Sequence, residues 1–162
     1  MSQGTGRTVQ DSRASVVRLT VPTDANFMGH VFGGVILAEI DRVAYITATR
    51  HSGLSCVTAS FDRVDFLVPV TVGQVLDFES RITFVGRSSM EVWVEVRAED
   101  LAGGPKLLVG NAFVTMVAID GKGRPTPVRP LLPATEEERR RFADGAARME
   151  MRRKSRAPTP KD

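Results

Sequence analysis

The chain has few of the residues that build disulfides and metal sites. It contains one cysteine, Cys56, and two histidines, His30 and His51, among 162 residues. A single cysteine excludes a disulfide within the chain, and these residues show none of the spacings of a metal cluster. The sequence therefore predicts a protein that needs no metal and no redox cofactor.

Long apolar segments are also missing. No apolar run reaches the roughly 18 residues of a membrane span. The N-terminus, Met1 to Arg13, is polar and lacks the apolar middle of a signal peptide. We therefore expect a cytoplasmic protein that does not insert into membranes.

Several signatures of hydrolases and nucleotide-binding proteins do not occur. There is no Gly-x-Ser-x-Gly elbow, no His-Glu-x-x-His zinc motif, no Gly-x-Gly-x-x-Gly and no Gly-Lys-Ser/Thr loop. If the chain is an enzyme, its chemistry must come from another arrangement of side chains.

Positive charge is concentrated near the C-terminus, although the net charge is only +3. The basic residues there are Arg139, Arg140, Arg141, Arg148, Arg152, Arg153, Lys154 and Arg156. They are consistent with a solvated helix face and a loose tail, or with attraction for an anionic ligand such as a nucleotide phosphate. No aromatic platform accompanies them, so we expect no nucleic-acid partner.

Hydrophobic patterning predicts one α+β domain with an antiparallel sheet around one helix. The segment 35–50 is apolar nearly all round and reads as a helix buried by the sheet. The expected strands are 15–21, 55–68, 74–85, 89–100 and 106–120, with short turns between the last four. We assign 1–13 as a disordered N-terminus, 14–133 as the domain, 134–154 as a C-terminal helix and 155–162 as a disordered tail.

Asp41 is the residue that fits its surroundings least well. It lies in the middle of the apolar helix, beside Leu37, Tyr45 and Ala48 on the helical wheel. A carboxylate there must be paired, protonated or facing a cleft. It can form a salt bridge to an arginine or a polar contact in a dimer, or it can be a catalytic carboxylate.

Two turns offer further candidate groups. The loop before the helix supplies Asn26 and His30, and the backbone N–H groups of Gly33 and Gly34 can form an oxyanion hole. The turn Gly86–Ser89 carries Arg87, Ser88 and Ser89, which suit either an ordinary hairpin or a contact with a phosphate. Thr58 and Ser60, on the strand after the helix, are candidates for supporting the site.

Several segments together resemble one family. The stretch PTDANFMGHVFGG (22–34) is similar to the motif that leads into the helix of the acyl-CoA thioesterases. The likeness continues through Asp41 and returns in FLVPVTVG (66–73), ITFVGRSSMEV (82–92) and GRPTPV (123–128). These proteins include short bacterial enzymes and the duplicated brain acyl-CoA hydrolase of vertebrates. The likeness covers about 15–154, most of the chain.

The resemblance implies the hotdog fold and hydrolysis of fatty acyl-CoA to a free fatty acid and CoA. Asp41 matches the family's catalytic aspartate, as general base or nucleophile, and Asn26 matches an asparagine that the duplicated enzyme takes from its other repeat. A single chain of this kind would form dimers with shared sites, as a trimer of dimers. Two alternatives stay open: a hotdog hydratase or dehydratase using His30, and a non-catalytic acyl-CoA sensor.

Overall fold

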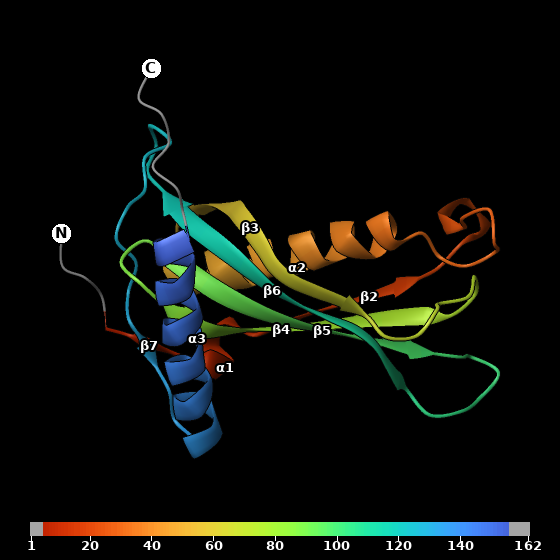
Figure 1. The fold of residues 1–162 in the computed structure, drawn as a ribbon. Coiled ribbons are helices and arrows are strands. Elements are labelled where there is room, and N and C mark those ends of the chain that lie inside the picture. Colours follow the sequence, from red (N-terminus) through yellow and green to blue (C-terminus); the bar gives the residue numbers. More distant parts are fainter. Residues whose placement is uncertain (1–4, 156–162) are drawn as a thin grey trace.

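A helix of 20 residues, α2 (Gly33–Ser52), lies along one face of a five-stranded antiparallel sheet (Figure 1). The computed structural model describes residues 5–155. The helix ends at Gly53, whose φ of 71° is left-handed and is readily adopted only by glycine. The predicted helix at 35–50 is thus confirmed and extends by about half a turn at each end.

The sheet has the strand order β2-β4-β5-β6-β3. Its strands are β2 (Ala14–Leu19), β3 (Ser55–Phe66), β4 (Val75–Val85), β5 (Ser89–Glu99) and β6 (Leu107–Ile119). The two edge strands are therefore β2 and β3, which correspond to the predicted strands 15–21 and 55–68. The structure confirms the α+β architecture and all five predicted strands.

The core lies between α2 and the inner face of the sheet. Alternate residues of the central strand β5, Val92, Val94 and Val96, are fully buried there, and α2 meets them with Ile40 and Val43. Burial of this apolar surface is the main driving force for folding. One flank of α2 nevertheless stays exposed in the protomer, because the sheet covers the helix from one side only.

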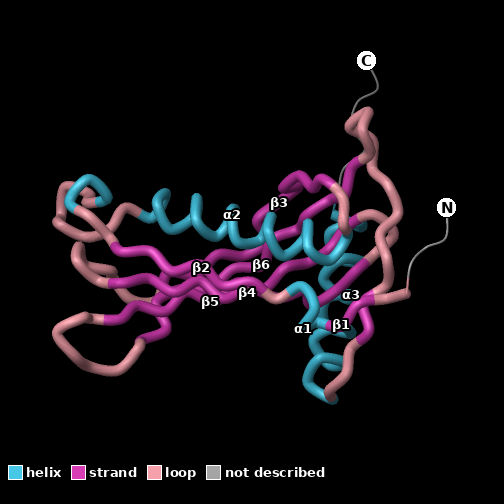
Figure 2. Tube along the Cα trace, turned by 180° about the vertical axis from the view of Figure 1, so that it is seen from behind, coloured by secondary structure: helices cyan, strands magenta, loops and turns pink. Residues whose placement is uncertain are grey.

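A second long helix, α3 (Glu136–Ser155), packs across the outer face of the sheet (Figure 2). The C-terminal helix predicted at 134–154 is thus present, and its N-terminus is capped: the Thr135 hydroxyl accepts from the Glu138 N–H at 3.1 Å and the Glu138 carboxylate accepts from the Thr135 N–H at 3.2 Å. No helix within residues 5–155 is both long and apolar enough to cross a membrane.

The N-terminal segment is more ordered than the sequence suggests. Residues 1–13 were expected to be disordered, but β1 (Arg7–Thr8) pairs in parallel with β7 (Leu131–Leu132). A short helix, α1 (Val9–Ser12), follows β1 and carries a capping box between Thr8 and Asp11. The polar composition of residues 7–12 does not reveal this N-terminal anchor, because β7, the strand with which β1 pairs, lies far along the chain. A 3₁₀ turn (Pro22–Asp24) precedes the loop to α2, and residues 156–162 of the expected tail lie outside the described residues.

Gly145 is the point where α3 comes closest to the sheet. A Cβ added there would lie 2.5 Å from Cβ of Phe84 and 3.0 Å from a carboxylate oxygen of Glu91. Alanine favours a helix over glycine by about 1 kcal/mol. The collision of an added Cβ with a side chain of the sheet lowers the free energy of unfolding by more than this gain, typically by about 1–3 kcal/mol.

We therefore predict that Gly145→Ala lowers the melting temperature, by roughly 2–6 °C for a chain of this size. Gly121→Ala is the matched control, because a Cβ at Gly121 meets nothing within 4 Å. Thermal unfolding of both variants checks the prediction. A Gly145→Ala protein that melts above wild type would contradict this packing.

Candidate active site

Asp41 is half-buried on α2 and faces the edge strand β3. Its Oδ1 accepts a hydrogen bond of 2.5 Å from the Thr58 hydroxyl, which also lies 3.4 Å from the Met116 sulfur. Within residues 5–155, the Asp41 carboxylate makes no ion pair, and its Oδ2 forms no hydrogen bond. The second oxygen is thus available to accept a proton.

Glu39, the other acidic residue of α2, has a different environment. Its carboxylate is buried and lies 2.6 Å from Arg18 and 2.5 Å from Arg42. Arg18 also binds Asp24 at 2.7 Å. The arginines near α2 therefore neutralise Glu39 and not Asp41, so the salt-bridge interpretation of Asp41 does not hold in the protomer. A polar dimer contact and a catalytic role remain.

The loop before α2 fixes the side chain of Asn26. The Asn26 Oδ1 accepts from the N–H groups of Met28 at 2.9 Å and His30 at 3.1 Å. The Asn26 N–H also donates to the His30 carbonyl at 2.7 Å. This local bonding turns the carboxamide oxygen into the loop. The side-chain NH₂ makes no hydrogen bond to any residue between 5 and 155 and so can donate to another molecule.

Gly33 and Gly34 begin the first turn of α2, where no helical carbonyl precedes the backbone N–H groups to accept their hydrogen bonds. The N-cap, Phe32, provides no side-chain acceptor for them. A Cβ at Gly34 would lie 2.9 Å from the Phe32 ring, so only glycine lets that ring pack against this turn. The arrangement suits binding of a developing negative charge.

These groups do not converge within one protomer. Asp41 lies eight residues beyond Gly33 on α2, which corresponds to about 12 Å along the helix axis. The loop that carries Asn26 precedes the helix and extends beyond its N-terminal end (Figure 1). The predicted pair of catalytic groups is therefore too widely separated to act together in a single chain.

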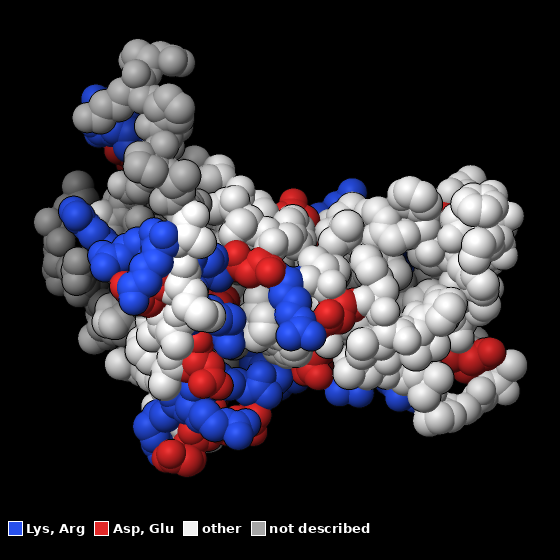
Figure 3. Space-filling view, in the orientation of Figure 1, with Lys and Arg blue, Asp and Glu red and all other residues white. Residues whose placement is uncertain are grey.

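Exposed apolar side chains surround the Asn26 end of the molecule. Phe27 is 98% exposed, which is exceptional for a phenylalanine. The other exposed apolar residues nearby are Met28, Phe32, Phe66, Leu67 and Val68. Charged side chains gather at the α3 end, whereas the opposite end is mainly uncharged on the face shown in Figure 3. Such a patch marks an interface or a site for an apolar ligand.

The predicted phosphate-binding turn lies toward the other end of α2. Arg87 is exposed, and its guanidinium contacts no carboxylate in the part of the chain that the structure describes. Thr58 of β3 pairs with Met116 of β6, which in turn pairs with Met90 of β5. Arg87 precedes Met90 by three residues. Arg87 and Thr58 are then roughly 14 Å apart. Ser88 and Ser89 lie in the same turn, which a hydrogen bond of 2.8 Å from Gly86 N–H to the Ser89 carbonyl closes.

Ser60 does not lie beside Asp41, although the sequence suggested both it and Thr58 as supporting residues. Its hydroxyl donates to Asp62 at 2.8 Å, on the outer face of the sheet. The register of β3 shifts between Thr58 and Ser60, so Ala59 is an extra residue. A bulge of this kind reverses the alternation of side chains, and it turns Thr58 and Ser60 to opposite faces.

Neither histidine lies in contact with Asp41. His30 is half-buried, and its backbone pairs with Thr71 in an isolated β-bridge. His51 is buried, its Nε2 lies 3.1 Å from the Arg129 carbonyl oxygen, and burial lowers the pKa of its ring below the usual value. A hydratase needs a histidine base near the carboxylate, and no histidine between residues 5 and 155 is in contact with Asp41.

Sequence reasoning missed a cluster of ionic residues on the outer face of the sheet. The Glu91 side chain is completely buried and is paired with Arg148 of α3 at 2.7 Å. Alternation along β5 predicts that Glu91 faces away from the core, but no sequence signal links it to an arginine 57 residues away. Among the residues that the structure describes, no group of three or more His, Cys, Asp or Glu side chains is placed to hold a metal ion.

Comparison with known proteins identifies relatives over most of the chain. The family model of the thioesterase superfamily matches residues 28–104. The uncharacterized acyl-CoA thioester hydrolase YkhA of Bacillus subtilis is 42% identical over 132 residues, a match that covers 82% of this chain and 77% of that protein. The cytosolic acyl coenzyme A thioester hydrolase of Rattus norvegicus is 37% identical over 143 residues, covering 87% of this chain and 38% of the rat protein.

Solved structures agree closely with this fold. An apo-hexameric acyl-CoA thioesterase is 43% identical, with a TM-score of 0.88 and coverage of 95% of this chain and 99% of that chain. The acyl-CoA hydrolase from Staphylococcus aureus, in complex with butyryl coenzyme A, coenzyme A and coenzyme A disulfide, is 35% identical. Its TM-score is 0.83, and 90% of this chain and 89% of that chain are covered. Three further structures of the Staphylococcus aureus protein each carry an alanine, in place of an aspartate, an asparagine or a threonine.

Proposed function

The chain belongs to the thioesterase superfamily and within it to the acyl-CoA hydrolases, and we propose that it hydrolyses fatty acyl-CoA in a site shared between two protomers. The observation that carries this proposal is the environment of Asp41. Among residues 5–155 its carboxylate has no counter-ion; it is held at one oxygen by Thr58 and lies on a flank of α2 that the sheet leaves open. A catalytic base needs these properties.

In the proposed reaction, Asp41 acts on a water molecule or attacks the thioester carbonyl itself. As a general base, Oδ2 removes a proton from water while the water oxygen bonds to the carbonyl carbon. The carbonyl oxygen becomes an oxyanion, which the Asn26 NH₂ and the free N–H groups near Gly33 stabilise. The carbon–sulfur bond then breaks, and Asp41 returns its proton to the leaving CoA thiolate. The products are a fatty acid and CoA, and no cofactor takes part.

The second protomer completes the site in this proposal. Leu37 lies midway between Gly33 and Asp41 in sequence. A two-fold axis near Leu37 would therefore set the start of one α2 beside Asp41 of the other, in an antiparallel pair. The small residues Gly34 and Ala38 are exposed on this helix and would allow close approach. Asn26 of the partner subunit would then reach the thioester.

The edge strands support the same assembly. β3 borders β6 on one side only, so its other side offers unpaired backbone groups to a second β3. Two structures of relatives are hexameric. We propose that this chain forms dimers through β3 and α2, and that three dimers assemble into a hexamer.

Variants of the Staphylococcus aureus relative support this choice of residues. The aspartate, asparagine and threonine that were replaced by alanine in it have the same separations in sequence as Asp41, Asn26 and Thr58. The complexes of that protein with butyryl coenzyme A and coenzyme A support an acyl-CoA substrate here. We propose that the apolar residues beside Asn26 favour a fatty acyl chain, and that Arg87, with Ser88 or Ser89, binds a CoA phosphate.

The protein is proposed to act in the cytoplasm. A cytosolic relative matches 87% of the chain, and this supports the assignment.

We predict that Asp41→Asn lowers kcat by at least about 100-fold and leaves the melting temperature nearly unchanged. The substitution keeps the shape and the acceptor for Thr58 but removes the base. Release of CoA from an acyl-CoA, followed with a thiol reagent, measures the effect. The control is Glu39→Gln, which disturbs the contacts with Arg18 and Arg42 and should lower stability more than kcat. Near-normal turnover by a folded Asp41→Asn protein would refute the mechanism.

For Arg87→Ala, the expected result is a higher KM for all acyl-CoA substrates and a nearly unchanged kcat. A remote phosphate contact stabilises the ground state and the transition state alike. Initial rates with acyl-CoAs from acetyl to palmitoyl give both constants. Arg139→Ala removes an equal charge from an exposed pair with Glu136 and should change neither constant. A KM equal to that of wild type would rule out the phosphate contact.

The shared site predicts complementation between two inactive proteins. Asn26→Ala and Asp41→Asn damage different halves of the site. If they are unfolded together and reassembled at random, about half the dimers are mixed, and each mixed dimer has one intact site out of two. Activity should therefore recover to about a quarter of wild type. Subunit exchange without recovery would mean that the two residues act within one chain or that one of them is not needed.

A further inference from the structure

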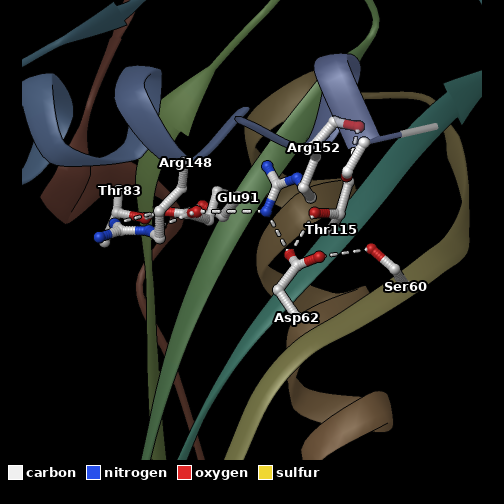
Figure 4. A network of polar contacts seen from close by, with 8 residues as sticks. Ser60, Asp62, Thr83, Glu91, Thr115, Arg148 and Arg152 are labelled. Carbon is white, nitrogen blue, oxygen red and sulfur yellow. Dashed lines mark hydrogen bonds and ion pairs between the residues drawn. The ribbon is translucent and has the colours of Figure 1, made fainter. Parts of the chain in front are cut away.

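The outer face of the sheet carries a connected set of ionic and hydroxyl side chains beneath α3 (Figure 4). Glu91 is its buried centre, held by Arg148 through hydrogen bonds of 2.7 and 3.0 Å and by the Thr83 hydroxyl at 2.7 Å. Arg152, one turn further along α3, lies 3.6 Å from Glu91 and also pairs with Asp62 of β3. Arg152 thus connects the central strand of the sheet to its edge strand.

Asp62 is the end of this set nearest to the candidate active site. It accepts hydrogen bonds from the Ser60 hydroxyl at 2.8 Å and from the Thr115 hydroxyl at 2.7 Å, and Arg152 supplies its positive partner. The Asp62 side chain is only 14% exposed, so solvent screens this ion pair weakly. The contacts hold Asp62 and Ser60 on the outer face.

The same stretch of β3 is irregular. The register with β6 shifts between Thr58 and Ser60 and again between Phe61 and Arg63, so Ala59 and Asp62 are both extra residues. Thr58 faces α2 only because the first bulge separates it from Ser60. If the bulge moved by one residue along the strand, the side chain at one of these positions would change faces. An edge strand has one neighbour to resist such a shift, so side-chain contacts matter more here.

We propose that Arg152 is a positioning residue for catalysis. Through Asp62 and Ser60 (Figure 4) it fixes the bulge in β3. The fixed bulge keeps the Thr58 hydroxyl on Asp41. Helix α3 therefore acts on the active site through the sheet, although it packs on the opposite face. This proposal rests on the proposed function, in which Thr58 supports the Asp41 base.

A double-mutant cycle between Arg152 and Thr58 tests the proposal. Arg152→Gln is expected to lower kcat about five- to tenfold, with KM within about twofold of wild type. In the Thr58→Ala background, the same substitution should change kcat by less than about twofold, because the hydroxyl that it positions is gone. All proteins are assayed as full chains, at a temperature well below their measured melting temperatures.

Two variants act as controls. Arg153→Gln removes the neighbouring arginine, whose side chain is 80% exposed and pairs with Glu150, and should leave kcat unchanged in both backgrounds. Arg152→Lys should restore most of the activity lost in Arg152→Gln, because a single nitrogen, Nη1, makes both contacts of Arg152.

The result that overturns the proposal is an equal loss of kcat on Arg152→Gln with and without Thr58, which would indicate a general structural role. Unchanged kcat in the otherwise wild-type protein would overturn it as well. If Thr58→Ala alone leaves kcat unchanged, both this proposal and the role of Thr58 fail. The Asp41→Asn and complementation experiments test the shared hydrolase site independently of this result.

Discussion

The hydrogen bond between Asp41 and Thr58 is the contact on which the proposed chemistry depends. It joins the inner helix to the edge strand at a half-buried position, where no arginine of the described part of the chain pairs with the carboxylate. An acidic group in such a place costs stability, since part of its hydration is lost without a compensating cation. Glu39, two residues away, shows that the fold can supply arginines to α2. The lack of one at Asp41 therefore favours a catalytic purpose over a structural one.

The sheet separates two kinds of environment that the chemistry requires. Its inner face is apolar and supports α2, so that the helix presents Asp41 at a fixed height above β3. Its outer face carries charged side chains among aromatic ones, and there α3 is held by the bidentate pair of Arg148 and Glu91 and by the contact of Phe142 with Phe84. Removing one partner of such a buried pair is strongly destabilising, because the remaining charge stays buried. α3 is thus part of the domain and not an appended tail.

Much of the fold could be predicted from the sequence, because periodicity reports which residues face the core. The limits of α2 and of the five strands agree with the predicted limits to within about two residues. Ser60 was misassigned because period-two alternation assumes a regular strand, and the bulge at Ala59 leaves no mark in composition. The pair of Glu91 and Arg148 joins residues far apart in sequence, so only the packing of α3 reveals it. The order of residues 7–12 was not predicted for the same reason, because β1 pairs with β7 from the other end of the chain.

The distance between Asn26 and Asp41 makes assembly a condition of activity in this account. One protomer holds each group in place, Asn26 by its own loop and Asp41 by Thr58, but Asn26 precedes the start of α2 and Asp41 lies in the middle of the helix. The most direct test is a crystal structure of the wild-type protein with a ketone analogue of acyl-CoA, in which a methylene group replaces the thioester sulfur. The analogue's carbonyl is expected to lie between Asp41 of one chain and Asn26 of the partner subunit. A carbonyl bound by Asp41 and Asn26 of a single chain, or remote from both residues, would contradict it.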